Sequence, residues 1–216
     1  MLTPSALKHI VPHFALILPV LCYFVLLWPH FITSPAVVTG AFALLFGTWQ
    51  ATVLTYAWSA SSQYKNALFP VTKRGSWKNA ATLVIIVYVF SHVAIILMGA
   101  PLSTDVIETA SLSVLTSCLV STPAISLLSS SSLHVYLEVL LCGRFARDDT
   151  RSRFVYMQMI GVIVGTWMSV FAIPLDWDRP WQKWPIPLVI GAISGYCVML
   201  LFDIFIRVQK YRSKFQ

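Results

Sequence analysis

Six runs of about 20 predominantly apolar residues constrain this chain more than any other feature of its sequence. A helix of about 20 residues crosses the ~30 Å hydrocarbon core of a bilayer, and within that core each backbone polar group must be bonded inside its own segment. The runs lack the alternation that a barrel strand needs. With 57% hydrophobic residues and a mean hydropathy of +0.76, the sequence predicts an all-α, polytopic membrane helical bundle.

About six transmembrane helices are expected, within a single integral membrane domain of residues 1–216. The fourth run is too long for one straight crossing, because 36 helical residues would extend about 54 Å. It contains Pro123 and the serine run 129–132, so we expect it to be kinked or broken. It is either one span with an interfacial extension or two short spans. The predicted spans are about 9–28, 35–57, 79–98, 108–143, 154–174 and 185–207.

The distribution of basic residues favours six crossings. With six, thirteen of the fifteen Lys and Arg residues lie on one side, and only Arg179 and Lys183 lie on the other. If the fourth run crossed twice, the two sides would be nearly equal. Because Lys and Arg accumulate in cytoplasmic loops, both termini are predicted to be cytoplasmic.

The net charge of +7 has the same explanation, since basic loops face an anionic cytoplasmic leaflet. The basic loops 72–78 and 143–153 are short and do not interleave aromatic residues as a nucleic-acid surface does, so no nucleic-acid partner is expected. The four cysteines contain no C-x-x-C pair and are interpreted as small apolar packing residues.

Ionisable residues at membrane depth are candidate functional groups, because burying them is costly unless they are paired. Asp203 and Arg207 are spaced i, i+4 near the cytoplasmic end of the last span, where they are expected to pair structurally. His9 and His13 begin the first span and are expected only at the membrane interface.

His134 and Glu138 form a possible intramembrane polar site, also at i, i+4 on one helical face. The pair could relay protons, form one edge of a metal site with a further ligand such as His92, or bond together to fix helix packing. The sequence shows no nucleophile with its base and no phosphate-binding glycine loop. We therefore expect no catalytic residues, no metal and no cofactor. Serines and threonines in 111–132 are expected to bond to their own helix or a neighbouring one.

The stretch IPLDWDRPWQKWPIP, residues 173–187, lies between the fifth and sixth spans on the side opposite the termini. Its two Asp, one Arg and one Lys sum to zero, so the hairpin turn is polar without a net charge. Trp177, Trp181 and Trp184 would share one side of a short helix at the headgroup level. Pro180 either limits that helix or begins it.

Both flanking spans carry a G-x-x-x-G pattern, which lets helix backbones approach closely. Gly161 and Gly165 lie in the fifth span, and Gly191 and Gly195 lie in the sixth. Two such patterns around one stiff turn indicate either a compact internal hairpin or a surface for the spans of another protein.

Residues 173–196 resemble the C-terminal signature of the PIG-F family, small multispan endoplasmic reticulum proteins of glycosylphosphatidylinositol (GPI) anchor biosynthesis, and the resemblance by motif covers about residues 161–196. Ser169 and Ala172 stand where many members of that family have Gly and Pro. The luminal signature hairpin consists of Pro174, Leu175, Asp176, Trp177, Asp178, Arg179, Pro180, Trp181, Gln182, Trp184 and Pro185, followed by Gly191, Ala192 and Gly195.

The resemblance implies a non-catalytic, stabilising membrane subunit of a GPI ethanolamine-phosphate transferase, located in the endoplasmic reticulum membrane. The partner would be a large multispan catalytic subunit, which transfers ethanolamine phosphate to mannose of the GPI precursor. An alternative is a lipid-handling protein that presents phosphatidylethanolamine or the GPI intermediate, with His134, Glu138 and the serines lining a polar groove. An intramembrane enzyme using His134 and Glu138 is a third possibility.

Overall fold

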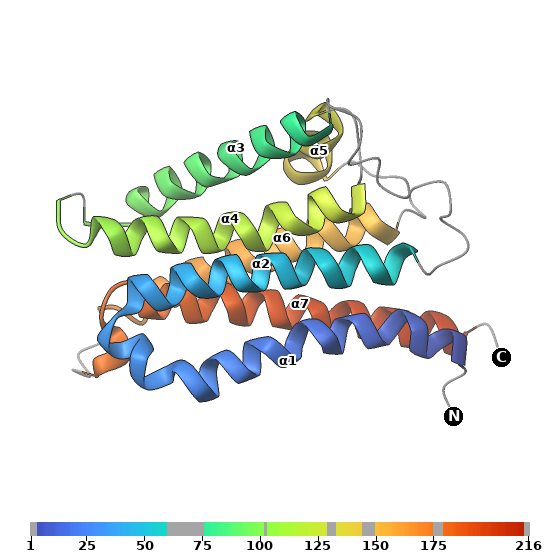
Figure 1. The fold of residues 1–216 in the computed structure, drawn as a ribbon, viewed down its shortest axis with the longest axis horizontal. Coiled ribbons are helices and arrows are strands. Elements are labelled where there is room, and N and C mark those ends of the chain that lie inside the picture. Colours follow the sequence, from blue (N-terminus) through green and yellow to red (C-terminus); the bar gives the residue numbers. More distant parts are fainter. Residues whose placement is uncertain are drawn as a thin grey trace.

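The structure is a computed structural model that describes residues 4–59, 76–101, 103–128, 133–143, 150–174 and 179–213. The regular secondary structure of this part of the chain is entirely helical, which confirms the all-α prediction (Figure 1). The helices are α1 (Pro4–Thr33), α2 (Pro35–Ser59), α3 (Ser76–Leu97), α4 (Val106–Leu128), α5 (Leu133–Cys142), α6 (Thr150–Val170), the 3₁₀ helix η2 (Pro180–Gln182) and α7 (Ile186–Arg212).

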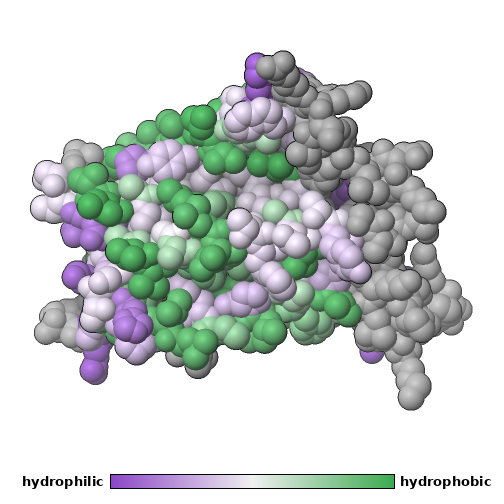
Figure 2. Space-filling model, viewed as in Figure 1, coloured by the Kyte–Doolittle hydropathy of each residue, from purple (hydrophilic) through white to green (hydrophobic). Residues whose placement is uncertain are grey.

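Five of these helices, α2, α3, α4, α6 and α7, are each long and apolar enough to cross a membrane. Helix α1 adds a sixth span if its two halves, bent by 55°, are counted together. The predicted number of about six spans is therefore confirmed. Figure 2 shows hydrophobic and weakly polar side chains over the middle of one face, with hydrophilic ones gathered at its left end.

Helix α4 is the most deeply buried span, and it packs against α2, α3 and α6. Helices α6 and α7 pair closely, α1 packs against α2 and α7, and α3 lies at the edge of the bundle (Figure 1). Helix α1 begins and α7 ends at the same end of the bundle, on the right of Figure 1. Because the first helix starts and the last helix ends at the same end of the bundle, the chain crosses it an even number of times.

The fourth predicted span is divided between α4 and the ten-residue α5. Helix α4 crosses the bundle, whereas α5 lies at an angle to it and contacts α3 and α6 at the end of the bundle (Figure 1). This is the arrangement of one span with an extension. Pro123 lies inside α4, and the serine run 129–132 lies outside the described residues.

Several hydroxyl groups of α4 are bonded as a membrane span requires. Ser113 Oγ donates to the Thr109 carbonyl at 2.8 Å, and Thr116 Oγ1 donates to the Leu112 carbonyl at 3.1 Å. Ser117 Oγ reaches across to the Val84 carbonyl on α3 at 3.1 Å. Both predicted modes, bonding to the same helix and to a neighbouring helix, are thus present.

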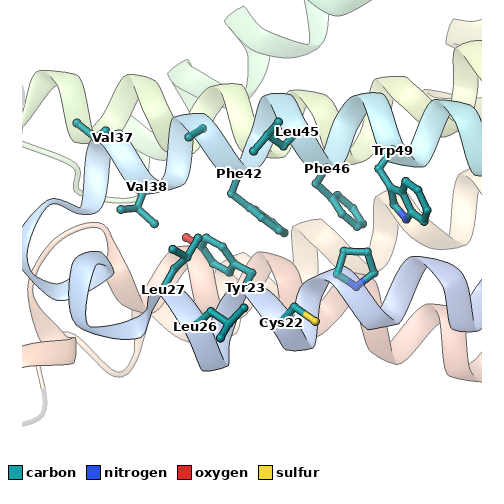
Figure 3. Close-up of a pocket in the computed structure, with 12 residues that line it drawn as sticks. Cys22, Tyr23, Leu26, Leu27, Val37, Val38, Phe42, Leu45, Phe46 and Trp49 are labelled. Atoms are coloured by element: carbon teal, nitrogen blue, oxygen red, sulfur yellow. The ribbon is translucent and has the colours of Figure 1, made fainter.

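Helix α1 bends between Tyr23 and Leu26, a feature that sequence reasoning missed. Pro29 explains the bend, because it offers no N–H to the carbonyl four residues earlier and its ring presses against that carbonyl. Two further prolines, Pro12 and Pro19, also lie inside α1. The bend turns the second half of α1 relative to the first, beside the straight α2 (Figure 3).

Pro19 leaves the Ala15 carbonyl without its usual helical donor. The indole Nε1–H of Trp49 on α2 donates to that carbonyl at 2.9 Å. An interhelical hydrogen bond therefore replaces an intrahelical one and joins α1 to α2.

Trp49→Phe is expected to lower the free energy of unfolding by about 1 kcal/mol, because the Ala15 carbonyl loses its donor. In a Pro19→Ala background the same change is expected to cost much less, since the backbone N–H at position 19 can bond to Ala15. Unfolding midpoints of the four variants in mild detergent measure this coupling. Equal costs of Trp49→Phe in both backgrounds would contradict the explanation.

Candidate functional site

The two G-x-x-x-G patterns face each other across the α6–α7 contact. A Cβ on Gly161 would lie 2.5 Å from the Gly195 carbonyl oxygen, closer than real Cβ atoms come. A Cβ on Gly165 would overlap the Gly191 carbonyl, and one on Gly195 would overlap the Gly161 carbonyl. The backbones of α6 and α7 are therefore in contact along one turn of each helix. We call these four glycines the glycine seam. They lie between the two helices of the hairpin.

The signature turn, which contains η2, connects the end of α6 to the start of α7. Pro180 is the first residue of η2, and Arg179 precedes it in an extended conformation. Proline suits this position because the first helical N–H has no intrahelical partner. Leu175, Asp176, Trp177 and Asp178 lie outside the described residues.

Gln182 connects the two sides of the turn. Its Oε1 accepts the Arg179 backbone N–H at 2.9 Å, and its Nε2 donates to the Ala172 carbonyl at 3.0 Å. The first bond fixes the start of η2. The second gives a donor to a carbonyl just beyond the end of α6, where no helical donor remains.

Trp181 and Trp184 lean inward from the turn and pack against the hydrophobic core. Trp184 Nε1–H donates to Thr109 Oγ1 near the start of α4 at 3.0 Å, and Pro185 is buried. The turn is thus bonded to α4 as well as to α6. Pro174, Arg179, Pro180 and Lys183 are exposed at this end of the bundle.

His134 and Glu138 lie together on α5, with 3.5 Å between Nδ1 and Oε2. Their side chains are 77% and 38% exposed, and α5 is not among the helices long enough to span a membrane. His92 bonds elsewhere, with its Nδ1 2.9 Å from Ser113 Oγ. Within the described ranges, no three His, Cys, Asp or Glu side chains come together as a metal site would require.

A buried polar triad of His13, Asp203 and Arg207 lies at the opposite end of α7 from the turn. Asp203 Oδ2 is 2.8 Å from His13 Nε2 and 2.5 Å from Arg207 Nε. His13 is 2% exposed and Asp203 4%, and the His13 ring meets Phe154 of α6 edge-on. The pairing of Asp203 with Arg207 was expected from their spacing.

His13 does more than the interfacial placement expected of it, because the triad buries this residue against α6 and α7. A signal was available in the sequence. His13 follows the start of the first span by about the distance at which Asp203 precedes the end of the last span, and in an even-span bundle these two positions lie at similar depth.

Comparisons with known proteins place the chain among GPI-anchor biosynthesis proteins. The model of the "GPI biosynthesis protein family Pig-F" matches residues 5–203. The "GPI ethanolamine phosphate transferase, stabilizing subunit" of Mus musculus is 36% identical over 115 residues, which cover 52% of this chain and 50% of the mouse protein.

Two fungal relatives share shorter segments. The "Glycosylphosphatidylinositol anchor biosynthesis protein 11" of Debaryomyces hansenii is 37% identical over 103 residues, 48% of this chain and 43% of that protein. A "PIGF/3-ketodihydrosphingosine reductase fusion protein" of Schizosaccharomyces pombe is 67% identical over 36 residues, 17% of this chain and 7% of the fusion. The chain spans about half or less of the length of these relatives, and no solved structure shows significant similarity.

Proposed function

We propose that this chain, which belongs to the GPI biosynthesis protein family Pig-F, is the non-catalytic stabilising membrane subunit of a GPI ethanolamine-phosphate transferase. The observation that carries the proposal is the family match over residues 5–203, which includes the first five predicted spans and all but the last four residues of the sixth. The name of the mouse relative describes the same role for that protein. The transfer of ethanolamine phosphate to mannose of the GPI precursor would be performed by the large multispan catalytic subunit.

The proposed location is the endoplasmic reticulum membrane, with both termini in the cytosol. The described basic residues support this orientation. Only Arg179 and Lys183 lie at the turn end, and the remaining seven lie at the end where α1 begins and α7 ends. This distribution follows the rule that Lys and Arg are retained on the cytoplasmic side. The basic residues at that end are Lys8, Lys78, Arg151, Arg153, Arg207, Lys210 and Arg212.

The α6–α7 hairpin is the part that we propose contacts the catalytic subunit. The glycine seam is filled by the chain's own backbones, so a partner helix would pack on the outer side of α6 rather than on Gly161 or Gly165. That side exposes Trp167, Met168 and Phe171, which are 51%, 56% and 57% exposed. Dispersion contacts over such a face are the kind that hold membrane helices together.

The lipid-handling alternative, with a polar groove for a headgroup, has less support. His134 is largely exposed on α5, and the hydroxyls of Ser113 and Ser117 are bonded within the bundle. Asp176 and Asp178 of the turn, which could meet the ammonium of a headgroup, lie outside the described residues. We therefore retain the subunit proposal as the first candidate.

A pull-down of the tagged full chain from endoplasmic reticulum membranes in mild detergent tests the proposal. Recovery of a large multispan transferase is expected with the wild type. Trp167→Ala with Phe171→Ala is expected to reduce that recovery severalfold, because the outer face of α6 loses two large side chains. The matched control is Trp77→Ala with Phe90→Ala on α3, whose side chains are 62% and 67% exposed.

The outcomes separate the two parts of the proposal. Wild type that recovers no transferase would contradict the subunit role itself. Equal recovery by both double variants would leave the subunit role in place and rule out the outer face of α6 as the contact.

A further inference from the structure

An apolar groove of about 600 Å³ lies between α1 and α2 (Figure 3). Its lining comes only from these two helices and runs from Pro19 to Leu27 on α1 and from Val37 to Trp49 on α2. The groove adjoins the bend of α1. It belongs neither to the glycine seam nor to the buried polar triad.

The floor of the groove is a row of stacked aromatic rings. Tyr23 and Phe42 have ring centroids 3.9 Å apart, and Phe42 and Phe46 have centroids 5.2 Å apart. All three residues are buried, at 4%, 7% and 2% exposure, and Figure 3 shows their rings between the two helices. Stacked rings that are packed on both sides hold the floor in one shape, so the groove is preformed.

The rim of the groove opens toward the surrounding membrane. Leu26, Val37 and Leu45 line the rim and are 70%, 72% and 71% exposed. All three lie at the depth of the spanning segments, in the half of the bundle nearer the α1–α2 connection. A ligand can therefore enter sideways from the bilayer.

The lack of charge on the walls restricts the occupant to hydrocarbon. None of the lining residues carries a formal charge. Of the polar groups in the lining, the indole N–H of Trp49 is already donated to the Ala15 carbonyl, the Tyr23 hydroxyl oxygen is buried, and the Cys22 thiol is a weak donor. A polar or charged occupant would lose its solvation here without gaining partners, whereas a saturated chain loses nothing.

The dimensions of the groove exclude a helix lying fully inside it. The lining of α2 from Val37 to Trp49 extends about 18 Å at 1.5 Å per residue. Even the whole empty space of the groove, about 1180 Å³, gives a cross-section of only about 66 Å² over that length. A helix with side chains is 10–12 Å wide, or about 80 Å² or more in cross-section.

We propose that this groove binds one acyl chain of a membrane phospholipid, entering with its headgroup at the level of the α1–α2 connection. The described charges at that end, Arg179 and Lys183 with Asp105 and Glu108, sum to zero, which suits a zwitterionic headgroup such as phosphatidylcholine. The bound chain covers the rings of the floor where α1 bends away from α2. This proposal does not depend on the subunit role.

Photo-crosslinking of the purified full chain tests the proposal. The protein is placed in nanodiscs that contain phosphatidylcholine with a diazirine halfway along one acyl chain, irradiated, and digested for mass spectrometry. Adducts are expected on the lining residues of α1 and α2 in excess of those on the equally lipid-facing residues Val89 and Phe90 of α3.

A matched pair of substitutions, one in the groove and one on α3, makes the test specific. Ala41→Phe adds a ring to an exposed lining position and is expected to reduce the groove adducts to the level found on α3. Val89→Phe adds comparable bulk on α3 and should leave them unchanged. Leu45→Trp, at the rim, is a second variant that narrows the entrance without entering the core, and it should also reduce the adducts.

Two results would overturn the proposal that the groove binds an acyl chain. Adducts spread evenly over α1, α2 and α3 would show ordinary lipid contact and overturn the proposal. Groove adducts that disappear when the chain is crosslinked within its membrane complex would assign the groove to a partner helix instead. Gel filtration of each variant confirms that the protein compared is folded.

Discussion

Gly195→Ala is expected to disrupt the α6–α7 hairpin and to lower the free energy of unfolding by about 3 kcal/mol. The added Cβ would overlap the Gly161 carbonyl oxygen, which is backbone and cannot swing aside as a side chain can. The two helices must then separate along the seam. The measurement is the midpoint of thermal unfolding in mild detergent, read together with the yield of monodisperse protein.

Gly40→Ala is the matched control, because a Cβ at this helical position of α2 has nothing within 4 Å. This change is expected to be neutral or to stabilise by up to about 1 kcal/mol, since alanine loses less conformational entropy than glycine in a helix. If Gly195→Ala and Gly40→Ala gave the same unfolding midpoint, the seam would not be the contact that holds the hairpin.

Asp203→Leu is expected to cost about 3–5 kcal/mol in the free energy of unfolding, because it removes the carboxylate that accepts from both His13 and Arg207. The Arg207 side chain is 10% exposed and would lose its paired anion within the bundle. The cost of an uncompensated buried charge exceeds the cost of the lost hydrogen bonds. Unfolding in mixed detergent, followed by the near-ultraviolet signal of the tryptophans, measures it.

Glu138→Leu on α5 removes a carboxylate from the other i, i+4 pair with a similar loss of side-chain charge. Because His134 and Glu138 are substantially exposed, this change is expected to shift the free energy of unfolding by less than about 1 kcal/mol. A second control replaces the whole triad by His13→Leu, Asp203→Leu and Arg207→Met. It is expected to recover much of the lost stability, since apolar residues can replace a buried ionic group. Failure of that variant to exceed Asp203→Leu alone would argue against the lost ion pair as the cause.

Both substitutions act on α7, but at opposite ends of it. Gly195 lies in the seam toward the turn, and Asp203 binds α1 through His13 near the other end. For a stabilising subunit, either loss should reduce the transferase recovered with the chain by lowering the folded population. The α6 surface variant should reduce recovery without lowering the unfolding midpoint, which distinguishes contact from folding.

The sequence by itself determined the properties that depend on one segment at a time. Span number follows from the length and hydropathy of each run, and the orientation of the termini was predicted from the basic loops. The amino-acid sequence also reveals the stiff turn at Pro180 and the four small residues Gly161, Gly165, Gly191 and Gly195. The division of the fourth run was expected because 36 residues exceed one crossing.

Only the tertiary structure decided how the helices face one another. It turned the two glycine pairs inward, buried His13 against Asp203, left His134 and Glu138 on a short outer helix, and formed a groove where α1 bends. In a soluble protein an apolar stripe would indicate the buried side of each helix. A membrane span is apolar on its lipid side as well as its protein side, so its sequence does not reveal its rotation, and close packing with polar pairing selects the contacts.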